Sequence, residues 1–334
     1  DAGEKIFHAE PIVGGINRLS FFVPLNAARG ATFSRWRLSQ DGGLSVTGVV
    51  NGGEVEDHAF LVGPPEQGEC DPRTHRGKDF WLTFPGNLTA GQTNGHSVEL
   101  CITGARETQG LVEMPGLTMP FSKAFSIGPA NFVIIKLPLE ADLGDLVDAV
   151  APLGIHVTAD REVAVYALNR FPFTTDGYLG LPSDIISGDY IVQCYPNVQS
   201  GVSELNGSQF AVVATQNDTT VIITPAADAA GYAAGVPYMT SLNRGDVYQL
   251  RSDKDTPADL SGSLVMADKP IGVFGSHQCA FIDSPSTFFC DYLVEQMLPI
   301  HRAGTTFHAT PLATRTGNIL CRVTATVDGT DVLL

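Results

Sequence analysis

Three residues in the last quarter of the sequence have the chemical types of a hydrolytic triad. Ser276 is a potential nucleophile, the adjacent His277 a potential general base, and Asp291 a potential partner that orients the imidazole. No Gly-x-Ser-x-Gly motif surrounds the serine, and neither His-Glu-x-x-His nor a phosphate-binding loop motif occurs. The alternative is a structural histidine near a disulfide loop. We therefore expect no catalytic residues and a protein that is not an enzyme.

A group of acidic residues near the N-terminus has the oxygen ligands that calcium takes. Asp41 lies in a predicted turn, and Glu54, Glu56 and Asp57 lie in a predicted strand. The alternative is cross-strand pairing of the two glutamates with the arginines of a neighbouring predicted strand, residues 32–38. Calcium is thus a candidate ligand, and no other cofactor is expected.

The sequence contains six cysteines. Cys279 and Cys290 lie in predicted strands on either side of a short polar loop, and this spacing predicts a disulfide that closes the loop. The other four cannot be paired from the sequence: Cys70, Cys101, Cys194 and Cys321. Because no Cys-x-x-Cys motif occurs, an oxidising, extracellular setting is favoured over a zinc or redox site.

The composition is typical of many short strands joined by turns. The chain has 334 residues, with 35 glycines, 21 prolines, 43% hydrophobic and only 17% charged residues. A formal charge of −16 argues against nucleic acid and anionic membrane surfaces as partners. No apolar run is long enough for a transmembrane helix, so no membrane insertion is expected. The chain opens at Asp1 without a visible signal peptide, which predicts a processed or truncated start.

One stretch of the sequence occurs twice. VTADREVAVY (residues 157–166) returns as VMADKPIGVF (residues 265–274), a constant offset of 108 positions from Val157 to Val265. Each copy is interpreted as strand, tight turn, strand. A second segment, VVATQNDTTVII (212–223), aligns with VTATVDGTDVLL (323–334), and more loosely with residues 100–103. We expect two full repeats and the opening hairpin of a third, each about the size of a β-sandwich domain.

Aromatic residues and sequons have two interpretations each. Phe80, Trp81 and Phe84 are expected to form the core of the first repeat, with a sugar-stacking platform as the alternative. Sequons at Asn87, Asn206 and Asn217 matter only if the source glycosylates them. Asn217 lies in a predicted hairpin turn, which explains it without a glycan.

The N-terminal part resembles a known module. FSRWRLS (33–39), the turn at residues 41–44 and GEVEDH (53–58) are similar to the C-terminal half of a GEVED domain, over residues 10–63. This resemblance implies a small β-sandwich module of bacterial secreted and surface proteins. Proline and glycine mark residues 64–77 as a linker.

The rest of the chain, residues 77–334, resembles the IgGFc-binding N-terminal domain family. GKDFWLTFP (77–85), ADKPIGVFGSHQC (267–279) and CDYLVEQMLP (290–299) are the matching segments. The resemblance implies an extracellular, non-enzymatic binding module and, beside a GEVED-like module, a bacterial source. The family name is not evidence that this chain binds IgG.

We therefore predict an all-β chain of tandem β-sandwich repeats with a small N-terminal β module. The predicted parts are 1–63, a linker at 64–77, repeats at 78–205 and 206–316, and a hairpin at 317–334. A β-propeller-like fold is the alternative. A propeller blade has about 40–45 residues, roughly half the unit seen here.

The predicted function is binding or adhesion by a secreted or cell-surface module, through loops at the ends of the sandwiches. The partner would be an extracellular protein or glycan. Candidate binding residues are Phe171, Phe173, Tyr178, His277, Phe281 and Phe288. For the aromatic ones the alternative is packing over the sandwich end. Alternative functions are a structural spacer of a long, self-associating surface fibre, and an accessory region of a secreted hydrolase.

Overall fold

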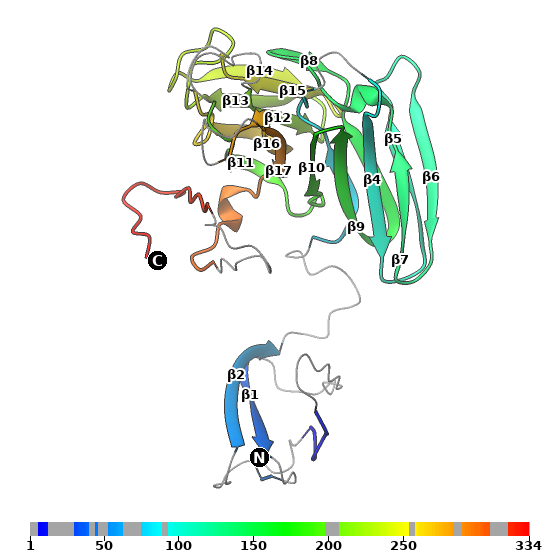
Figure 1. The fold of residues 1–334 in the computed structure, drawn as a ribbon, viewed down its shortest axis with the longest axis vertical. Helices are drawn as coiled ribbons and strands as arrows, with labels where there is room; N and C mark the ends of the chain where they lie inside the picture. Colours follow the sequence, from blue (N-terminus) through cyan, green and yellow to red (C-terminus); the bar gives the residue numbers. More distant parts are fainter. Residues whose placement is uncertain are drawn as a thin grey trace. The chain divides into compact units, whose positions relative to one another are not determined.

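A computed structural model describes residues 6–12, 30–39, 44–45, 53–62, 75–88, 93–197, 207–253, 258–282, 289–307 and 320–333 (Figure 1). The chain forms two compact units, residues 1–69 and 70–334. The described residues form strands and two short 3-10 helices, η2 (Leu139–Ala141) and η4 (Ile300–Arg302), without an α-helix. The all-β prediction is confirmed.

The N-terminal unit contains an antiparallel pair, β1 (Gly30–Ser39) and β2 (Gly53–Val62). The predicted pairing of Glu54 and Glu56 with the arginines of β1 is wrong, because the register places Arg35 opposite Asp57 and Arg37 opposite Val55. Side chains alternate between the two faces of a strand, so a one-residue difference in register places the glutamates and the arginines on opposite faces.

Several predictions for the N-terminal unit fall outside the described part of the chain. These are the residue Asp41, the linker up to residue 74, and the side chains of Glu54, Glu56 and Asp57. Calcium binding there stays a prediction.

The second unit holds two sets of strands that correspond one to one (Figure 1). The first repeat contains β3 (Gly77–Leu82), β4 (Ser97–Gly104), β5 (Thr108–Met114), β6 (Phe121–Ile127), β7 (Asn131–Lys136), β9 (Ile155–Phe171) and β10 (Thr174–Leu179). The second contains β11 (Ser187–Ile191), β12 (Ser208–Ala214), β13 (Thr219–Thr224), β14 (Tyr238–Leu242), β15 (Val247–Arg251), β16 (Leu264–Ala280) and β17 (Asp291–Gln296). One further strand, β8 (Ala149–Ala151), precedes β9.

Both repeats have the same pairing pattern. The strand order β6-β5-β9-β4-β7, with β3 and β10 also on β9, corresponds to β14-β13-β16-β12-β15, with β11 and β17 also on β16. The sequence repeat is therefore confirmed as a repeat of topology. The second sheet begins earlier than the predicted division at residue 206, because β11 pairs with β16.

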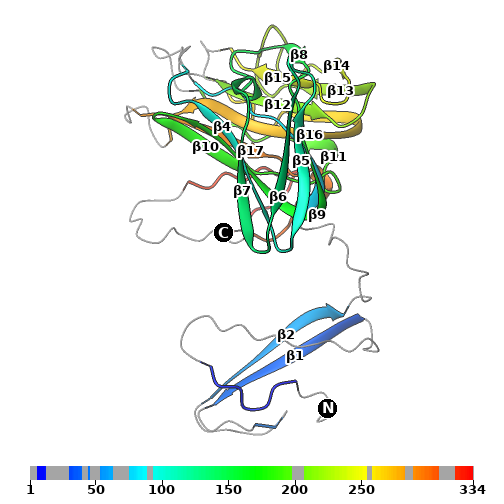
Figure 2. The ribbon, with the colours of Figure 1, turned by 90° about the vertical axis from the view of Figure 1, so that its right-hand side faces the viewer.

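The repeated segment is one long strand in each repeat, so the predicted tight turn inside it is wrong. β9 and β16 each have 17 residues, and Figure 2 shows β16 as a long gold ribbon across its repeat. Each strand exchanges neighbours midway: β9 pairs with β5 up to Ala159 and with β4 from Val163. The Asp and basic residues occupy this exchange point. Pro270 is tolerated there because the ladder to β13 ends at Ala267 and the ladder to β12 starts at Ile271.

Two large clusters and one small cluster of buried apolar side chains lie among the described residues of the unit, and the first draws residues from both repeats. Phe80, Leu82 and Val157 of the first repeat share this core with Val213 and Phe274 of the second. β8 also extends the second sheet by pairing with β15, although it precedes β9 in the chain. The two repeats are thus packed as one body.

The described C-terminal residues, 320–333, contain a turn near Gly329 but no strand. Arg322 holds this segment by donating hydrogen bonds to the Cys194 carbonyl and to Asp259 Oδ2, both at 2.6 Å. The hairpin of a third repeat stays a prediction.

Candidate functional site

The candidate triad does not form. His277 is buried, and its Nδ1 accepts a hydrogen bond from the Cys279 backbone N–H at 3.0 Å, where a triad needs a carboxylate. Asp291 instead accepts hydrogen bonds from the backbone N–H groups of Thr175 and Tyr292. Burial lowers the pKa of His277 to about 3. The imidazole is therefore a structural group, as the alternative interpretation held.

The predicted disulfide between Cys279 and Cys290 is confirmed, with a Cα–Cα distance of 5.1 Å. It joins the end of β16 to the start of β17. Of the remaining cysteines that the structure describes, Cys101, Cys194 and Cys321 are free thiols. Burial raises the pKa of Cys194 to about 12, so its thiol stays protonated near neutral pH.

The hairpin that joins β9 to β10 presents an exposed aromatic ring. Residues 172 and 173 form its tip, between the paired residues Phe171 and Thr174. Phe173 is 99% exposed and has a φ of +73°, a left-handed conformation that large side chains rarely adopt. The pyrrolidine of Pro172 precedes it, which favours a turn with positive φ at the next residue.

The start of β17, which follows the disulfide, lies beside this hairpin. The Thr175 N–H donates to Asp291 Oδ1 at 2.8 Å, and the Tyr292 N–H donates to Thr174 Oγ1 at 3.0 Å. These bonds join β10 to the start of β17 through side chains instead of a backbone ladder. Phe289, at the end of the disulfide loop, is 88% exposed. Two exposed phenylalanines, one from each repeat, thus flank the same seam.

The six predicted binding residues differ in position. Phe173 is exposed, Phe171 and Phe281 are half-buried, and Phe288 lies outside the described residues. Tyr178 and His277 are wrong as surface contacts, because both are buried and the Tyr178 hydroxyl donates to the Thr83 carbonyl. In a strand the side chains alternate, so half of any loop-flanking segment points into the core.

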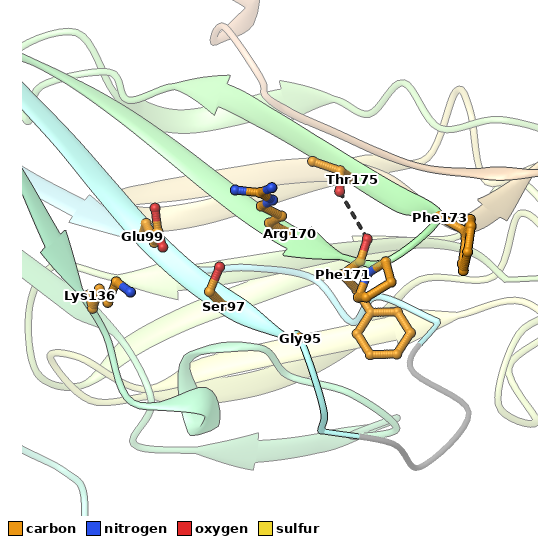
Figure 3. A pocket seen from close by; sticks show the side chains of 9 residues that line it. Gly95, Ser97, Glu99, Lys136, Arg170, Phe171, Phe173 and Thr175 are labelled. Carbon is orange, nitrogen blue, oxygen red and sulfur yellow. Dashed lines mark hydrogen bonds between the residues drawn. The ribbon is translucent and has the colours of Figure 1, made fainter.

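A surface pocket with a volume of about 560 Å³ opens on the outer face of the sheet, beside the hairpin (Figure 3). Its lining residues are Gly95, Ser97, Glu99, Lys136, Arg170, Phe171, Pro172, Phe173 and Thr175. They come from the turn before β4, from β4, β7, β9 and β10, and from the hairpin. The register places Ser97 and Thr175 on either side of Arg170, and Glu99 opposite Lys136.

A buried polar network supports the hairpin from below. His96 Nε2 lies 3.2 Å from Asp142 Oδ2, and the Asn169 amide donates to the same oxygen at 2.8 Å. The hydrogen bond to Asp142 raises the pKa of His96. The His96 ring meets Phe171 edge-on, with ring centroids 5.8 Å apart. Phe171 is therefore held in place, whereas Phe173 is not.

Asn87 also belongs to this network. Its Nδ2 donates to Asn169 Oδ1 and to the Thr174 carbonyl, and the residue is 1% exposed. This buried amide is unavailable to glycosylation in the folded protein. Asn217 is exposed in the turn between β12 and β13, as predicted, and Asn206 lies outside the described residues.

The aromatic residues near the start of the first repeat belong to its core, as predicted. Phe80, Trp81 and Phe84 are all buried. Trp81 stacks on His156 with ring centroids 4.1 Å apart, and the Arg244 guanidinium lies 5.1 Å from the Trp81 ring centroid. The alternative of a sugar-stacking platform is wrong for these residues, because their faces are covered.

Sequence reasoning missed Arg170, Ser97, Glu99 and Lys136. Each occupies an outward position of its strand, which alternation along β4, β7 and β9 could have indicated. Their proximity depends on strand order, because β4 lies between β7 and β9. A repeat pattern alone does not give that order.

Among the described residues, no group of three or more His, Cys, Asp or Glu side chains is arranged to hold a metal ion. The same residues include no helix with the length and hydropathy needed to cross a membrane.

Comparison with known proteins supports the resemblance to the IgGFc-binding family. Residues 176–334 match the family model described as IgGFc binding protein. A human protein named IgGFc-binding protein is 26% identical over 270 residues, which cover 80% of this chain but only 5% of that protein. This chain therefore spans a small part of its relative's length. The relative is human, so it gives no support to a bacterial source, and the GEVED-like resemblance stays a prediction. Over residues 176–334 the chain is thus similar to the IgGFc-binding protein family.

Proposed function

We propose that residues 70–334 form a secreted or cell-surface binding module without catalytic activity. Recognition occurs at the tip surface, defined here as the hairpin at residues 171–174 together with Phe289 beside the Cys279–Cys290 disulfide. The partner is an extracellular protein or a glycan that this surface contacts. The single observation that carries the proposal is Phe173, an almost fully exposed aromatic ring on a backbone at φ +73°.

The backbone conformation of Phe173 is energetically unfavourable in the free protein. An L-residue in the left-handed region costs roughly 1–2 kcal/mol, and an exposed phenylalanine recovers none of this by burial. Glycine or asparagine would satisfy the turn with less strain. A residue that destabilises the free protein is expected where it gains contacts on binding. Exposed aromatic rings are also the side chains that contribute most to binding interfaces.

The second repeat adds to the same surface. Phe289 is 88% exposed beside the disulfide, and Asp291 of β17 accepts a hydrogen bond from the Thr175 N–H. The disulfide fixes Cys290, the neighbour of Phe289, to the end of β16. Exposed aromatic rings from both repeats at one seam are suited to recognition. The human relative is named for binding the Fc part of IgG, so Fc is the first protein ligand to test.

The test measures binding of the intact chain to Fc, to an array of extracellular glycoproteins and to a glycan array. Positive ligands are then measured by biolayer interferometry with a double variant, Phe173→Ala with Phe289→Ala. We expect the double variant to lose at least about tenfold in affinity, since interface aromatics often contribute more than 1.4 kcal/mol.

The matched control is Phe132→Ala, because Phe132 is also exposed, at 59%, but lies on the edge strand β7 away from the tip surface. The control is expected to bind like the unmodified chain. Equal affinities for the unmodified chain and the double variant, with any ligand that binds, would overturn the proposal. Loss of affinity in the Phe132 variant alone would move the site to β7.

A further inference from the structure

The pocket beside the hairpin has the chemistry of a site for an acidic sugar. We propose that it binds a carboxylated or sulfated monosaccharide unit, with the anionic group at Arg170, the sugar hydroxyls at Glu99, Ser97 and Thr175, and one ring face against the hairpin phenylalanines. This inference rests on the proposed function, since the hairpin of the tip surface forms one wall of the pocket.

Arg170 supplies the anion contact. It occupies an exposed outward position near the end of β9, between Ser97 of β4 and Thr175 of β10. Within the described part of the chain, no ion pair or hydrogen bond engages its guanidinium group, so its donors are available to a ligand. A guanidinium binds a carboxylate or sulfate with two parallel hydrogen bonds, and the neighbouring Ser97 hydroxyl can donate a further one. Thr175 Oγ1 donates to the Phe171 carbonyl, so it is left to accept a hydrogen bond from a sugar hydroxyl.

Glu99 and Lys136 make the pocket more selective than a simple anion site. They lie opposite each other in the register of β4 and β7, one row from Arg170. Figure 3 shows Arg170 between Glu99 and Thr175. A carboxylate accepts hydrogen bonds from hydroxyl groups and repels a second anion. A ligand that binds both Arg170 and Glu99 therefore carries an anionic group on one side and hydroxyl donors on the other.

The hairpin provides the apolar wall. Phe171 is held edge-on to His96, and Phe173 projects freely at the tip. The C–H face of a sugar ring packs on such side chains, whereas a bare anion gains nothing from them. The volume of about 560 Å³ lies within the range of small-ligand sites. The lining, volume and charge of the pocket are thus all compatible with an acidic sugar.

The negative charge of the whole chain argues against non-specific binding of anions. With a formal charge of −16, the protein has no general attraction for anions. An acidic sugar that binds must therefore be bound by a local arrangement of donors. Two arginines on the same strand allow a matched comparison: Arg170 lines the pocket, whereas Arg161 is exposed at the exchange point of β9.

The test is saturation-transfer NMR and calorimetry on the intact chain at constant ionic strength. The probes are N-acetylneuraminic acid, glucuronic acid and galactose 6-sulfate, with N-acetylgalactosamine, sodium acetate and sodium sulfate as comparisons. We expect an acidic sugar to bind at least about tenfold more tightly than the neutral sugar and the simple anions. Arg170→Gln should remove this preference, and Arg161→Gln should leave it unchanged. Thermal unfolding checks that both variants are folded.

Three outcomes would overturn the inference: no binding of any acidic sugar, equal binding of acetate or sulfate, or equal affinities of the Arg170→Gln and Arg161→Gln variants. Failure here is distinguishable from failure of the proposed function. If Phe173→Ala with Phe289→Ala still abolishes binding of a partner while no acidic sugar binds, the tip surface stands and the pocket assignment falls. If the double variant binds every partner normally, the proposed function itself fails.

Discussion

At the scale of single residues, some corresponding positions of the two repeats keep the same side chain and others do not. Tyr178 and Tyr292 are corresponding residues of β10 and β17; both are buried, and each hydroxyl donates to a backbone carbonyl. Burial raises the pKa of both tyrosines. Asn169 and His277, in contrast, correspond in the sequence repeat but differ in bonding. Asn169 is part of a satisfied network, whereas His277 Nε2 has no hydrogen-bond partner among the described residues.

The buried His277 predicts an acid-sensitive fold. In the unfolded chain a histidine binds a proton near pH 6.5, whereas the folded chain does so only at about 3, because burial disfavours the charged ring. Its folded pKa is depressed, so the unfolded state binds more protons and stability is lost as pH falls from about 6.5 toward 3. We expect the difference in melting temperature between the unmodified chain and His277→Asn to shift in favour of the variant as pH falls.

The measurement is thermal unfolding at pH 7, 6, 5 and 4. Asparagine is the chosen residue because the first repeat has Asn169 at the corresponding position. Any packing loss in the variant is the same at every pH, so the slope with pH carries the result. Parallel pH profiles of the two proteins would contradict a buried neutral His277.

At the scale of elements, the long strands β9 and β16 organise the second unit. Each exchanges neighbours near its middle, at an Asp followed by a basic residue: Asp160 and Arg161 in β9, Asp268 and Lys269 in β16. The same strands end at the tip surface, β9 in the hairpin and β16 at Cys279. The element that holds the core together therefore also positions the proposed binding residues.

The hairpin after β9 predicts a trade between stability and binding. Phe173→Gly should raise the free energy of unfolding by about 0.5–1 kcal/mol, because glycine relieves the left-handed strain and the exposed ring loses no packing. Urea unfolding measures the change. Phe132→Gly is the contrast, since Phe132 lies in a regular strand, where glycine is destabilising. A less stable Phe173→Gly variant would mean that the ring packs on the protein.

At the scale of the whole molecule, the repeats are not independent domains. Val213 and Phe274 of the second repeat are in the same buried cluster as Phe80 of the first. The interface also contains buried polar contacts: Gln209 donates to the Gly86 carbonyl, and the Gly86 N–H donates to Gln249 Oε1. Buried polar groups of this kind favour one arrangement of the repeats, because displacement leaves them without partners.

A shared core predicts one cooperative transition for residues 70–334. In a Trp36→Phe background, Trp81 of the first repeat is the remaining tryptophan. Leu82→Ala in the first cluster and Leu250→Ala in the second should each destabilise by about 2–5 kcal/mol. Both should move the same Trp81 fluorescence transition in urea. If Leu250→Ala leaves that transition in place, the repeats unfold separately.

Part of this structure could be predicted from the amino acids, and particular residues show why. Alternation, turn residues and the offset from Val157 to Val265 gave the all-β class and the repeat, because these signals are local or periodic. The Cys279–Cys290 bridge followed from two strands around a short loop. Phe173 was identified as a loop residue, but its exposure and its φ were not.

The sequence by itself determined the all-β class, the repetition, the disulfide and a loop that contains Phe173. Only the tertiary structure decided that Tyr178 and His277 are buried, that Asp160 and Asp268 lie within long strands, and that the start of β17 meets β10. The reason is physical: local propensity depends on neighbours along the chain, whereas strand order, register and burial depend on pairings between distant residues. The seam where Thr175 meets Asp291, far apart in sequence, is set by those pairings alone.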